Sequence, residues 1–491
     1  MMPMTKDRSP VTAQEQAWAA LDGPPDLLRR VAPAAGGAAD GLRSALPVMD
    51  LARACVTSCS LAAAELAARR NGGPVPAVRV EDGAVATAFT SERHLRLDGR
   101  PAVTFAPLSK FWRAADGWVR THANYPHHRA RLLAALGAPA GAGPDVVGKL
   151  IEALPARTVE ETVYAAGGLA VAVRSPQDWD AHPQGRAAAA QPLVARERIA
   201  DAPARTLPPA PSGPLLPAAG LRVLDLTRVL AGPVATRTLG LLGADVLRVD
   251  SPLLPELEDQ HADTGFGKRS ALLDLEDRSD GGDRALLEKL LALADVVVTG
   301  YRPGALDEYG LSAHDMAERR PGLVVVQIRA WGTEGPWAGR RGFDSLVQAA
   351  SGIAATEAGP DGVPGALPAQ ALDHGSGYLM AAAVLRAVTD QTEYGGSRLV
   401  QLSLARTASW LMHGIGAGPA SGACEASRAA EASGAASPAS GEGADPLRWL
   451  AETDSELGRI RHALPPLAFD GGPRTWAQPP VRWGRSVPAW L

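Results

Sequence analysis

The chain has 491 residues, more than one ordinary hydrophobic core holds, so we expect two or three domains. A hydrophobic content of 46%, a charged content of 21% and a net charge of −4 are typical of a soluble globular protein, and they give no sign of a nucleic-acid-binding surface. The sequence has no uninterrupted apolar run of about 18 residues and no apolar signal core near its N-terminus, so we expect a cytoplasmic protein without a membrane partner.

The first 200 residues predict an α+β region. We expect a long Ala-rich helix at 51–70, short strands at 76–89 and 93–106, and a segment at 118–136 that begins extended and becomes helical. Cys55 and Cys59 are four residues apart and share one face of the long helix. No His or third Cys lies close to them in sequence, so we expect them to pack in the core rather than bind a metal.

Two breaks in composition divide the chain. The Pro- and Ala-rich stretch 201–220 is expected to be an interdomain linker, and 412–445, rich in Ala, Gly and Ser, a flexible surface segment. Residues 221–411 then form a second domain, and we expect 446–491 to pack back on both domains.

Residues 221–411 alternate short β-branched runs with helical patterns. We expect strands at 221–226, 245–250, 270–275, 295–300 and 323–329, and helices at 233–242, 283–294 and 313–320. Pro233 suits the first position of its helix. This alternation predicts a parallel sheet covered on both faces, and right-handed crossovers make it Rossmann-like. The predicted fold class is therefore α/β, with a Rossmann-like large domain and a smaller α+β domain.

The loop after the first strand, 227–240, is the first candidate site. In such a sheet the end of a strand and the start of the next helix attract anionic phosphates. No GxGxxG or GxxxxGK[ST] motif is present, which argues against ordinary dinucleotide and nucleoside triphosphate sites. From the residues alone, a simple tight turn remains the alternative.

Five segments follow one another in order: LRVLDLTRVLAGPVATRTLGLLGADVLRVDSP (221–252), GKRSALLDL (267–275), ADVVVTGYRPGALDEYGL (294–311), PGLVVVQIRAWGTEGPWAGRRGFDSLVQAASG (321–352) and ALDHGSGYLMAAAVLRAV (371–388). Together they resemble the class III CoA-transferase family, which includes formyl-CoA and carnitine CoA transferases. The resemblance implies a Rossmann-like large domain, dimers that interlock as rings, and acyl-CoA and a carboxylic acid as substrates. It implies no permanently bound cofactor.

Asp373 is the catalytic candidate. The resemblance implies that its carboxylate attacks an acyl-CoA thioester to give an acyl-aspartyl anhydride, releases CoA thiolate, and exchanges with an acceptor acid through an aspartyl thioester. Gly375 and Gly377 are expected to let substrate and backbone approach closely and to supply N–H donors to an oxyanion. From the residues alone, the alternative is that Asp373 merely caps the helix that follows.

Coenzyme A needs cationic and backbone donors for its phosphates and an apolar slot for adenine. The resemblance points to the first βα loop, the GKRS segment, the aromatic residue before RPG and an arginine at a strand end. These candidates are Val229, Leu230, Ala231, Lys268, Arg269, Tyr301 and Arg329, with Arg302 weaker. A solvated charge or a packed apolar residue is the alternative for each.

The N-terminal half resembles the later part of the same family. The segment LPVMDLARACVTSCSLAAAEL (46–66) is similar to a divergent copy of the region around Asp373, with Asp50 at the corresponding position. Residues 117–137 and 179–187 resemble the family's small domain. We therefore expect a homodimer or an intrachain pseudo-dimer. Asp50 lacks neighbouring glycines, which favours helix capping over catalysis.

Departures from the family leave two other functions open. Gly300 stands where the family has Asn before the aromatic residue, and TGFGKRS lacks an Asn before GKRS, as expected for a noncatalytic acyl-CoA-binding protein. A racemase or isomerase is the other alternative. The family's racemases use His in a Gly-His-Asp segment, but Phe343 holds that position here and cannot transfer a proton.

The histidines His122, His127 and His128 form a conspicuous cluster. Their spacing matches no standard metal motif, so we expect no metal site. We expect this segment to face the substrate or a domain interface.

Overall fold

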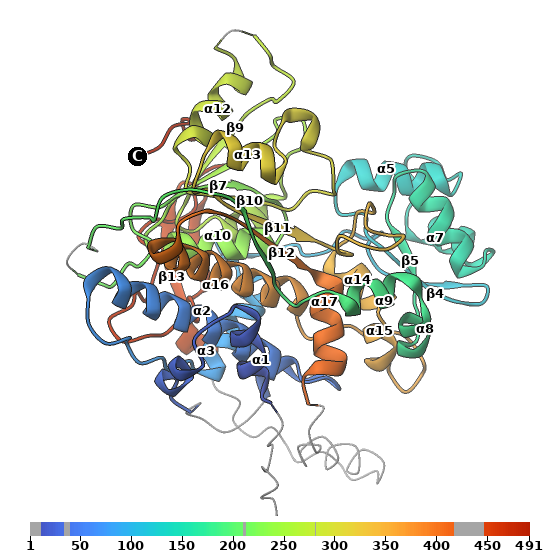
Figure 1. The fold of residues 1–491 in the computed structure, drawn as a ribbon. Helices are drawn as coiled ribbons and strands as arrows, with labels where there is room; N and C mark the ends of the chain where they lie inside the picture. Colours follow the sequence, from blue (N-terminus) through green and yellow to red (C-terminus); the bar gives the residue numbers. More distant parts are fainter. Residues whose placement is uncertain (1–10, 34–39, 210–212, 280, 417–445) are drawn as a thin grey trace, which may run out of the picture.

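A mostly parallel sheet of seven strands lies at the centre of the molecule (Figure 1). The computed structural model describes residues 11–33, 40–209, 213–279, 281–416 and 446–491. The strand order is β6-β12-β11-β10-β7-β8-β9, and β6 alone runs antiparallel to its neighbour β12. The strands are β6 (Ala195–Ala200), β7 (Arg222–Leu226), β8 (Asp245–Asp250), β9 (Lys268–Leu272), β10 (Val296–Thr299), β11 (Val324–Arg329) and β12 (Ser397–Ser403). The six parallel strands have the Rossmann order, which confirms the predicted fold class.

Helices cover both faces of this sheet. On one face, α10 (Ala231–Leu241) and α16 (Ala371–Tyr394) pack on the sheet, and α2 (Val48–Asn71) packs on α16 from outside in the same hydrophobic core. On the other face lie α12 (Asp283–Leu293) and α13 (Ala313–Arg319). The sheet is therefore buried on both faces, as its continuous β-branched runs predict.

The boundaries differ from the sequence expectations at three places. Strand β9 begins two residues earlier than expected, and α10 begins at Ala231, so Pro233 is its third residue and not its first. The expected strand at 76–89 is wrong, because its second half forms the helix α3 (Asp82–Phe89). Residues 84–89 are all buried there, and a short continuous apolar run fits a buried helix as well as a strand.

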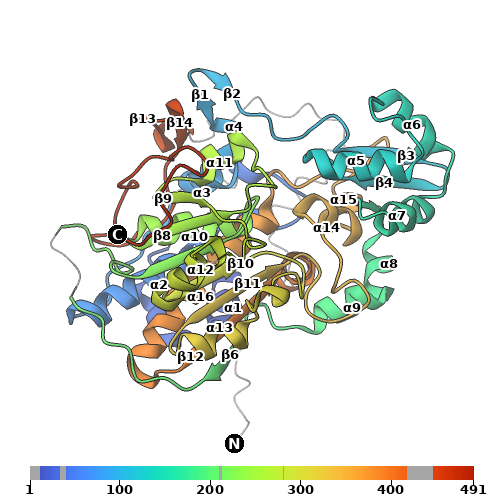
Figure 2. The ribbon, with the colours of Figure 1, turned by 90° about the horizontal axis from the view of Figure 1, so that it is seen from above.

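A small domain stands to one side of the sheet (Figure 2). It joins the antiparallel strands β3 (Phe111–Ala114), β4 (Gly117–Thr121) and β5 (Ala170–Ala172) to the helices α5 (Pro126–Ala135), α6 (Pro144–Glu152) and α7 (Ala156–Ala165) around a core of its own. The expectation of an extended start and a helical end for 118–136 is confirmed by β4 and α5.

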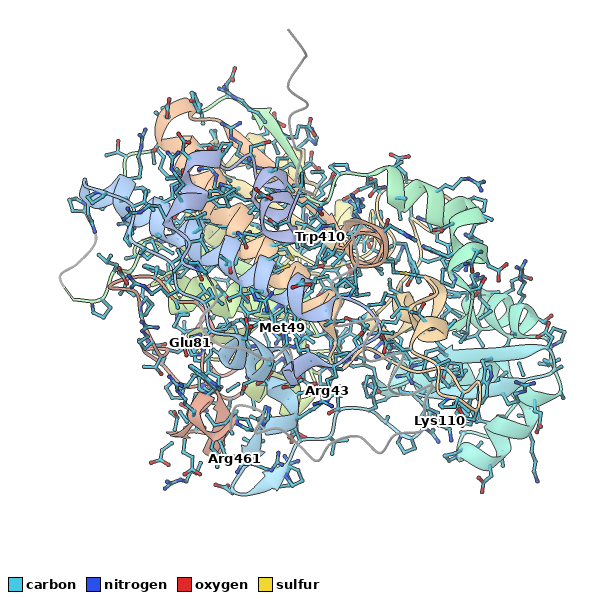
Figure 3. The ribbon with its side chains drawn as sticks, turned by 90° about the horizontal axis from the view of Figure 1, so that it is seen from below. Arg43, Met49, Glu81, Lys110, Trp410 and Arg461 are labelled. Atoms are coloured by element: carbon cyan, nitrogen blue, oxygen red, sulfur yellow. The ribbon has the colours of Figure 1, made fainter. Side chains whose placement is uncertain are left out.

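A third sheet pairs two strands from the first 200 residues with two strands from the last described segment. The short strands β1 (Arg96–Leu97) and β2 (Arg100–Pro101) extend the hairpin of β13 (Leu450–Ser455) and β14 (Gly458–Ala463). Figure 3 shows Arg461 of β14 and Lys110 of the small domain far apart on the lower side of the molecule. The expected strand at 93–106 is thus reduced to two strands of two residues. The remaining α-helices are α1 (Ala13–Ala20), α4 (Ser91–His94), α8 (Pro176–Ala181), α9 (Pro183–Ala190), α11 (Glu258–Thr264), α14 (Asp344–Ala350), α15 (Ile353–Thr356) and α17 (Leu404–Ser409).

The helices α2 and α16 have corresponding geometry. Each has 24 residues, each carries an aspartate at its third position, and each ends at a glycine with positive φ, Gly72 or Gly395. Among the described residues, α2 is the one helix long and apolar enough to cross a membrane, but 83% of its apolar window is buried in the molecule. Cys55 and Cys59 lie fully buried on α2 as free thiols, as expected, and burial raises the pKa of both.

The remaining sequence predictions concern the connections. Residues 201–220 run from β6 back to β7, and their Arg205 donates to Asp295 at 2.5 Å. Most of the expected flexible segment 412–445 lies outside the described residues, which end at Gly416 and resume at Pro446.

Candidate active site

The site lies where the strand order reverses. Strands β7 and β10 are neighbours, but their helices cover opposite faces, which opens a crevice at the carboxyl ends of the strands. The loop after β7 contains Val229, whose φ of 71° is rare for a β-branched residue. Its backbone N–H donates to Glu256 Oε2 at 3.2 Å. Such a strained backbone needs surrounding contacts to hold it, and strain of this kind gathers at functional sites.

Glu256 anchors this loop to the small-domain side of the molecule. Its carboxylate also accepts a hydrogen bond from the hydroxyl of Tyr125 and pairs with the buried Arg248 at 2.8 Å. Burial opposes ionisation, but the charges of Arg248 and Arg228 lower the pKa of Glu256 to about 2. The carboxylate is therefore ionised, and it joins the strand β8, the loop at Val229 and Tyr125 in one network.

Two cavities adjoin at the crevice. The smaller, of about 60 Å³, has five carboxylates in its wall and is called the acidic chamber below. These carboxylates belong to Glu92, Asp259, Asp263, Asp344 and Asp373. The larger, of about 340 Å³, has six arginines in its wall and is called the basic cavity. These are Arg131, Arg228, Arg302, Arg329, Arg340 and Arg341.

Three residues line both cavities and separate them. They are Val229 of the strained loop, Tyr125 just before α5, and Phe343 just before α14. His122 stacks on Phe343 with ring centroids 3.8 Å apart and an interplanar angle of 11°. The two cavities are therefore neighbours with one wall in common.

Asp373 lines the acidic chamber. It is the third residue of α16 and is 7% exposed. The helix begins after Gln370 without a side-chain cap, so the alternative that Asp373 merely caps it is wrong. Burial raises the pKa of Asp373 well above its usual range, and the neighbouring charge of Asp344 raises it further.

Asp344 is the closest polar partner of this position. Its Oδ2 accepts the backbone N–H of Asp373 at 2.9 Å, and its Oδ1 accepts the side-chain amide of Gln348. Gln348 is itself fixed, because its Oε1 accepts the N–H of Leu367 at 2.9 Å. Burial raises the pKa of Asp344 to about 6, although these hydrogen bonds favour the charged form. Two buried carboxyls with raised pKa values thus lie side by side at the start of α16.

Residues 218–440 match the sequence model of CoA-transferase family III. This match spans 223 of the 491 residues, so the likeness to CoA-transferase family III covers somewhat less than half of the chain.

Among curated proteins, the chain is 35% identical over 215 residues to an acetyl-coenzyme A transferase of Hypoxylon pulicicidum, covering 43% of this chain and 36% of that protein. It is 34% identical over 206 residues to a probable fatty acyl-CoA transferase of Mycobacterium tuberculosis, covering 39% of this chain and 52% of that one. A crystal structure of the mycobacterial protein is 32% identical, covers 41% of this chain and 58% of that one, and has a TM-score of 0.39. The chain thus spans about half or less of the length of these curated relatives.

Of the residues suggested by the family resemblance, six border the two cavities. Val229 lines both, Leu230 lines the acidic chamber together with Asp373, and Tyr301 and Arg329 line the basic cavity. Arg302, the weaker candidate, lines the basic cavity too. Ala231 lines neither; it begins α10, and its carbonyl oxygen faces α16, 2.7 Å from the Cβ that a side chain on Gly377 would have.

Lys268 and Arg269 correct the expectation, because neither side chain lines a cavity. Lys268 is 2% exposed, and its Nζ donates to Asp225 at 3.0 Å and to the carbonyl of Pro233 at 2.9 Å. Burial lowers the pKa of Lys268 to about 8, against the charge of Asp225. Arg269 pairs with Asp245 at 2.8 Å and donates to the carbonyl of Ala489. The two cations therefore hold the sheet and the C-terminal segment together.

The two glycines after Asp373 also act differently from the expectation. A Cβ on Gly375 would lie 2.8 Å from Leu51 of α2, and a Cβ on Gly377 would lie 2.7 Å from the carbonyl oxygen of Ala231. Both glycines thus permit helices to approach α16 closely, and neither lines the acidic chamber.

Asp50 lies away from both cavities. Its side chain is 56% exposed and pairs with Arg53 at 2.8 Å, one turn along α2. Arg53 is held in turn by Asp82 at 2.8 Å. Asp50 therefore has the helix position of Asp373 but neither its burial nor a cavity beside it.

The histidine cluster follows the separating wall. His122 lines the acidic chamber, and His127 and His128 line the basic cavity. Burial lowers the pKa of His122 well below its usual range and that of His128 to about 3, so both imidazoles are neutral. In the described part of the chain, no group of three or more His, Cys, Asp or Glu side chains is arranged to hold a metal ion.

Sequence reasoning missed several site residues. Asp344 directly follows Phe343, and an acidic residue at the start of a helix beside a conspicuous glycine is a usable signal. Arg340 and Arg341, adjacent in the same segment, are a second signal. Glu92 and Arg131 come from the first 200 residues, and nothing in their local sequence places them in the walls of the two cavities.

Proposed function

We propose that the chain transfers coenzyme A from an acyl-CoA to a carboxylic acid, with Asp373 as the nucleophile. The observation that carries this proposal is the buried position of Asp373 in the wall of a small chamber that adjoins an arginine-lined cavity. A thioester carbonyl must meet a carboxylate while the phosphates of coenzyme A are held some distance away, and the two cavities meet both needs. The activity in the names of the relatives agrees with it.

In the first half-reaction, a carboxylate oxygen of Asp373 attacks the thioester carbonyl carbon. The carbon–sulfur bond breaks, CoA leaves as the thiolate, and the acyl group remains on Asp373 as a mixed anhydride. The thiolate then attacks the aspartyl carbonyl, which releases the first acid and leaves an aspartyl thioester. Because Asp373 is 7% exposed, few water molecules reach either intermediate.

In the second half-reaction, the carboxylate of the acceptor acid attacks the aspartyl thioester. This step gives a new mixed anhydride and frees the CoA thiolate again. The thiolate attacks the acyl carbonyl of the acceptor, the product acyl-CoA forms, and Asp373 returns as a carboxylate. Every step exchanges one acyl bond for another, so no redox group or resident cofactor takes part.

Asp344 affects both the charge and the position of the proposed nucleophile. Its charge and the buried position together keep the carboxyl of Asp373 from ionising easily, so the carboxylate that does form is poorly stabilised and therefore reactive. The N–H of Asp373 is held by Asp344 at 2.9 Å, which fixes the start of α16 and hence the direction of the side chain.

The basic cavity is proposed to hold the phosphates of coenzyme A. Arginine binds phosphate through paired N–H donors, and six of these side chains line the cavity without a carboxylate among the lining residues. Arg341 has no ion-pair partner among the described side chains, and burial and the charges of Arg131 and Arg302 lower its pKa. A polyphosphate relieves this mutual repulsion when it binds.

Mass spectrometry of the labelled peptide tests the proposal. The chain is incubated with acyl-CoAs of several lengths, quenched in acid or with hydroxylamine, and searched for an acyl, CoA or hydroxamate adduct on Asp373. The matched control is Asp50→Asn, which changes the exposed aspartate at the same position of the partner helix. Asp373→Asn must abolish the adduct and Asp50→Asn must leave it. Tight acyl-CoA binding with no adduct and no exchange for any donor favours a noncatalytic binding protein.

One observation favours a second function, proton exchange at the carbon next to the thioester carbonyl. Phe343 cannot transfer a proton, but His122 stacks on it and lines the same chamber as Asp373. An imidazole and a carboxyl that line one chamber are the kind of pair that such proton exchange needs. Deuterium uptake from D₂O into acyl-CoA without CoA exchange, lost in His122→Phe, distinguishes this isomerase from the transferase.

A further inference from the structure

The acidic chamber is small, and hydrogen bonds hold its roof in place. Its volume of about 60 Å³ compares with the roughly 10–15 Å³ that one water molecule needs on the same measure, so it holds a group of about four to six non-hydrogen atoms. The roof is the segment Ala102–Phe105, which joins the hairpin of β1 and β2 to the small domain (Figure 2). Phe105 lines the chamber from this roof, and the guanidinium of Arg120 stacks on its ring at 5.1 Å.

Two side chains hold the roof in place. The amide of Asn124 donates to the carbonyl of Thr104 at 3.1 Å and accepts the N–H of Ala106 at 3.0 Å. Asp259 accepts the N–H of Val103 at 2.8 Å. Because the roof is pinned on both sides of Phe105, the chamber does not lengthen unless these bonds break.

The charge of the acidic chamber, like its size, restricts which groups can enter it. No Lys or Arg of the described chain lines it. Two of its five carboxylates are neutralised from outside, Asp259 by Arg100 at 2.5 Å and Asp263 by Arg237 at 3.4 Å. The other three, Glu92, Asp344 and Asp373, form no ion pair shorter than 3.9 Å in the described structure.

Of these three carboxylates, Glu92 is the one that is neither the proposed nucleophile nor its hydrogen-bond partner. It comes from α4 in the first 200 residues, and its side chain is 18% exposed. Its Oε2 has no hydrogen-bond donor, and the nearest basic side chains, those of Arg93 and His374, have nitrogen atoms 3.9 Å from the carboxylate. Burial opposes ionisation, but contact with His374 lowers the pKa of Glu92, so it carries its charge in the chamber.

We propose that the acidic chamber selects short monocarboxylic acids and short acyl groups, with Phe105 limiting their length and Glu92 rejecting acids that carry a second carboxylate. This inference rests on the proposed function, since it names the substrate class of the same site. A second carboxylate would add to the charge of Glu92 in a chamber that no Lys or Arg of the described chain lines, whereas a methyl or a hydroxyl end brings no charge.

Calorimetric titration of acids into the full chain saturated with coenzyme A tests this inference without turnover. The acids are propionate, glycolate, malonate, succinate and hexanoate. We expect propionate and glycolate to bind at least tenfold more tightly than the other three. Glu92→Gln is expected to reduce the discrimination against malonate at least tenfold, and Phe105→Ala to admit hexanoate. The matched controls are Glu152→Gln and Val146→Ala, both exposed on α6 and away from the chamber.

The outcomes separate this inference from the proposed function. Malonate or succinate binding as tightly as propionate overturns it, as does an unchanged malonate discrimination in a folded Glu92→Gln variant with the melting temperature of the parent. If the acids bind in the expected order but Asp373 carries no adduct, the selectivity stands and the proposed function fails. If the chain transfers CoA to succinate in preference to propionate, the proposed function stands and the selectivity fails.

Discussion

Leu51 of α2 lies where a side chain on Gly375 of α16 would have to go, since a Cβ there would be 2.8 Å from Leu51 Cδ2. Leu51 directly follows Asp50, and Gly375 is two residues after Asp373, so the corresponding starts of the two helices meet at this contact. The first 200 residues thus press directly against the helix turn that carries the proposed nucleophile. A change in one half of the chain at this crossing is felt in the site of the other half.

The helix crossing predicts an order of stabilities for three Gly→Ala variants. In Gly148→Ala the new methyl meets Trp112 at an ordinary 3.4 Å, so better helix propensity should stabilise the chain by about 0.5–1 kcal/mol. In Gly375→Ala, displacement of Leu51 offsets that gain, for a net loss of about 1 kcal/mol. Gly377→Ala meets the backbone oxygen of Ala231 at 2.7 Å, which cannot rotate away, and should lose about 2–3 kcal/mol. Urea unfolding measures all three, and Gly377→Ala as stable as Gly148→Ala would contradict the packing.

The parallel sheet was predictable because its strands carry their own signal. The runs at β8, β10 and β11 are short, β-branched and bounded by turns, and each was found within about two residues. The α3 segment was not predictable, because its Ala and Val residues fit either a helix or a strand and only contacts with the rest of the chain decide between them. Strands that are buried on both faces can therefore be recognised from their local sequence. Segments such as α3 cannot, because tertiary packing decides their conformation.

The site was predictable in part for a similar reason. Asp373 and Tyr301 each belong to a short contiguous motif, so the family resemblance alone pointed to them. Lys268 was misjudged because its burial against Asp225, 43 residues away, leaves no mark in the local sequence. Glu92 and Arg131 reach the cavities only because the first 200 residues fold over the crevice, which a motif in the other half cannot indicate.

Adduct formation on Asp373 is expected to rise with pH. Burial and the charge of Asp344 raise the pKa of Asp373, so the reactive carboxylate becomes populated only as the pH rises through that value. Replacing Asp344 with Asn removes one charge, and the rise should move to lower pH while the adduct still forms. Single-turnover rates between pH 5 and 9 measure the profile, with Asp50→Asn as the control that leaves it unmoved. A profile that moves to higher pH in Asp344→Asn would exclude a charge effect.

The carboxyl of Asp344 also predicts how the free energy of unfolding depends on pH. The pKa of Asp344 is raised from its ordinary value near 4 to about 6 by burial, so the folded chain holds this proton more tightly than the unfolded chain. Its contribution is therefore fully present below about pH 4 and is lost as the pH rises through about 6. The loss is roughly 3 kcal/mol, from two pH units at about 1.4 kcal/mol each. Free energies of unfolding at pH 4 and pH 7 should differ by less in Asp344→Asn than in the parent chain, and an equal difference would refute the assignment.

The basic cavity predicts which arginines bind coenzyme A. Arg131→Ala and Arg341→Ala should each weaken CoA binding about tenfold, since each removes a charge-assisted contact with phosphate. The loss should shrink as salt is raised, because screening weakens the parent's binding as well. Arg157→Ala, an exposed arginine on α7 outside both cavities, is the control and should bind like the parent. Fluorescence titration with a labelled CoA measures the dissociation constants. If the variant that combines Arg131→Ala and Arg341→Ala binds CoA as tightly as the parent, the phosphates do not bind in this cavity.

Both halves of the chain line both cavities, which predicts that one chain forms a complete site. Asp373 and Arg341 come from one half, and Glu92, Tyr125 and Arg131 from the other. The test pairs Asp373→Ala with a second chain that carries Tyr125→Ala and Arg131→Ala, co-expressed and purified through two tags. If each site lies within one chain, the mixed sample should be as inactive as the two variants alone. If copies exchange their N-terminal halves, up to half of the parent's exchange rate should return, since purification through both tags keeps only mixed dimers and one of the two sites in each of them is then intact. Recovery of activity would therefore establish a homodimer with shared sites and rule out the intrachain pseudo-dimer.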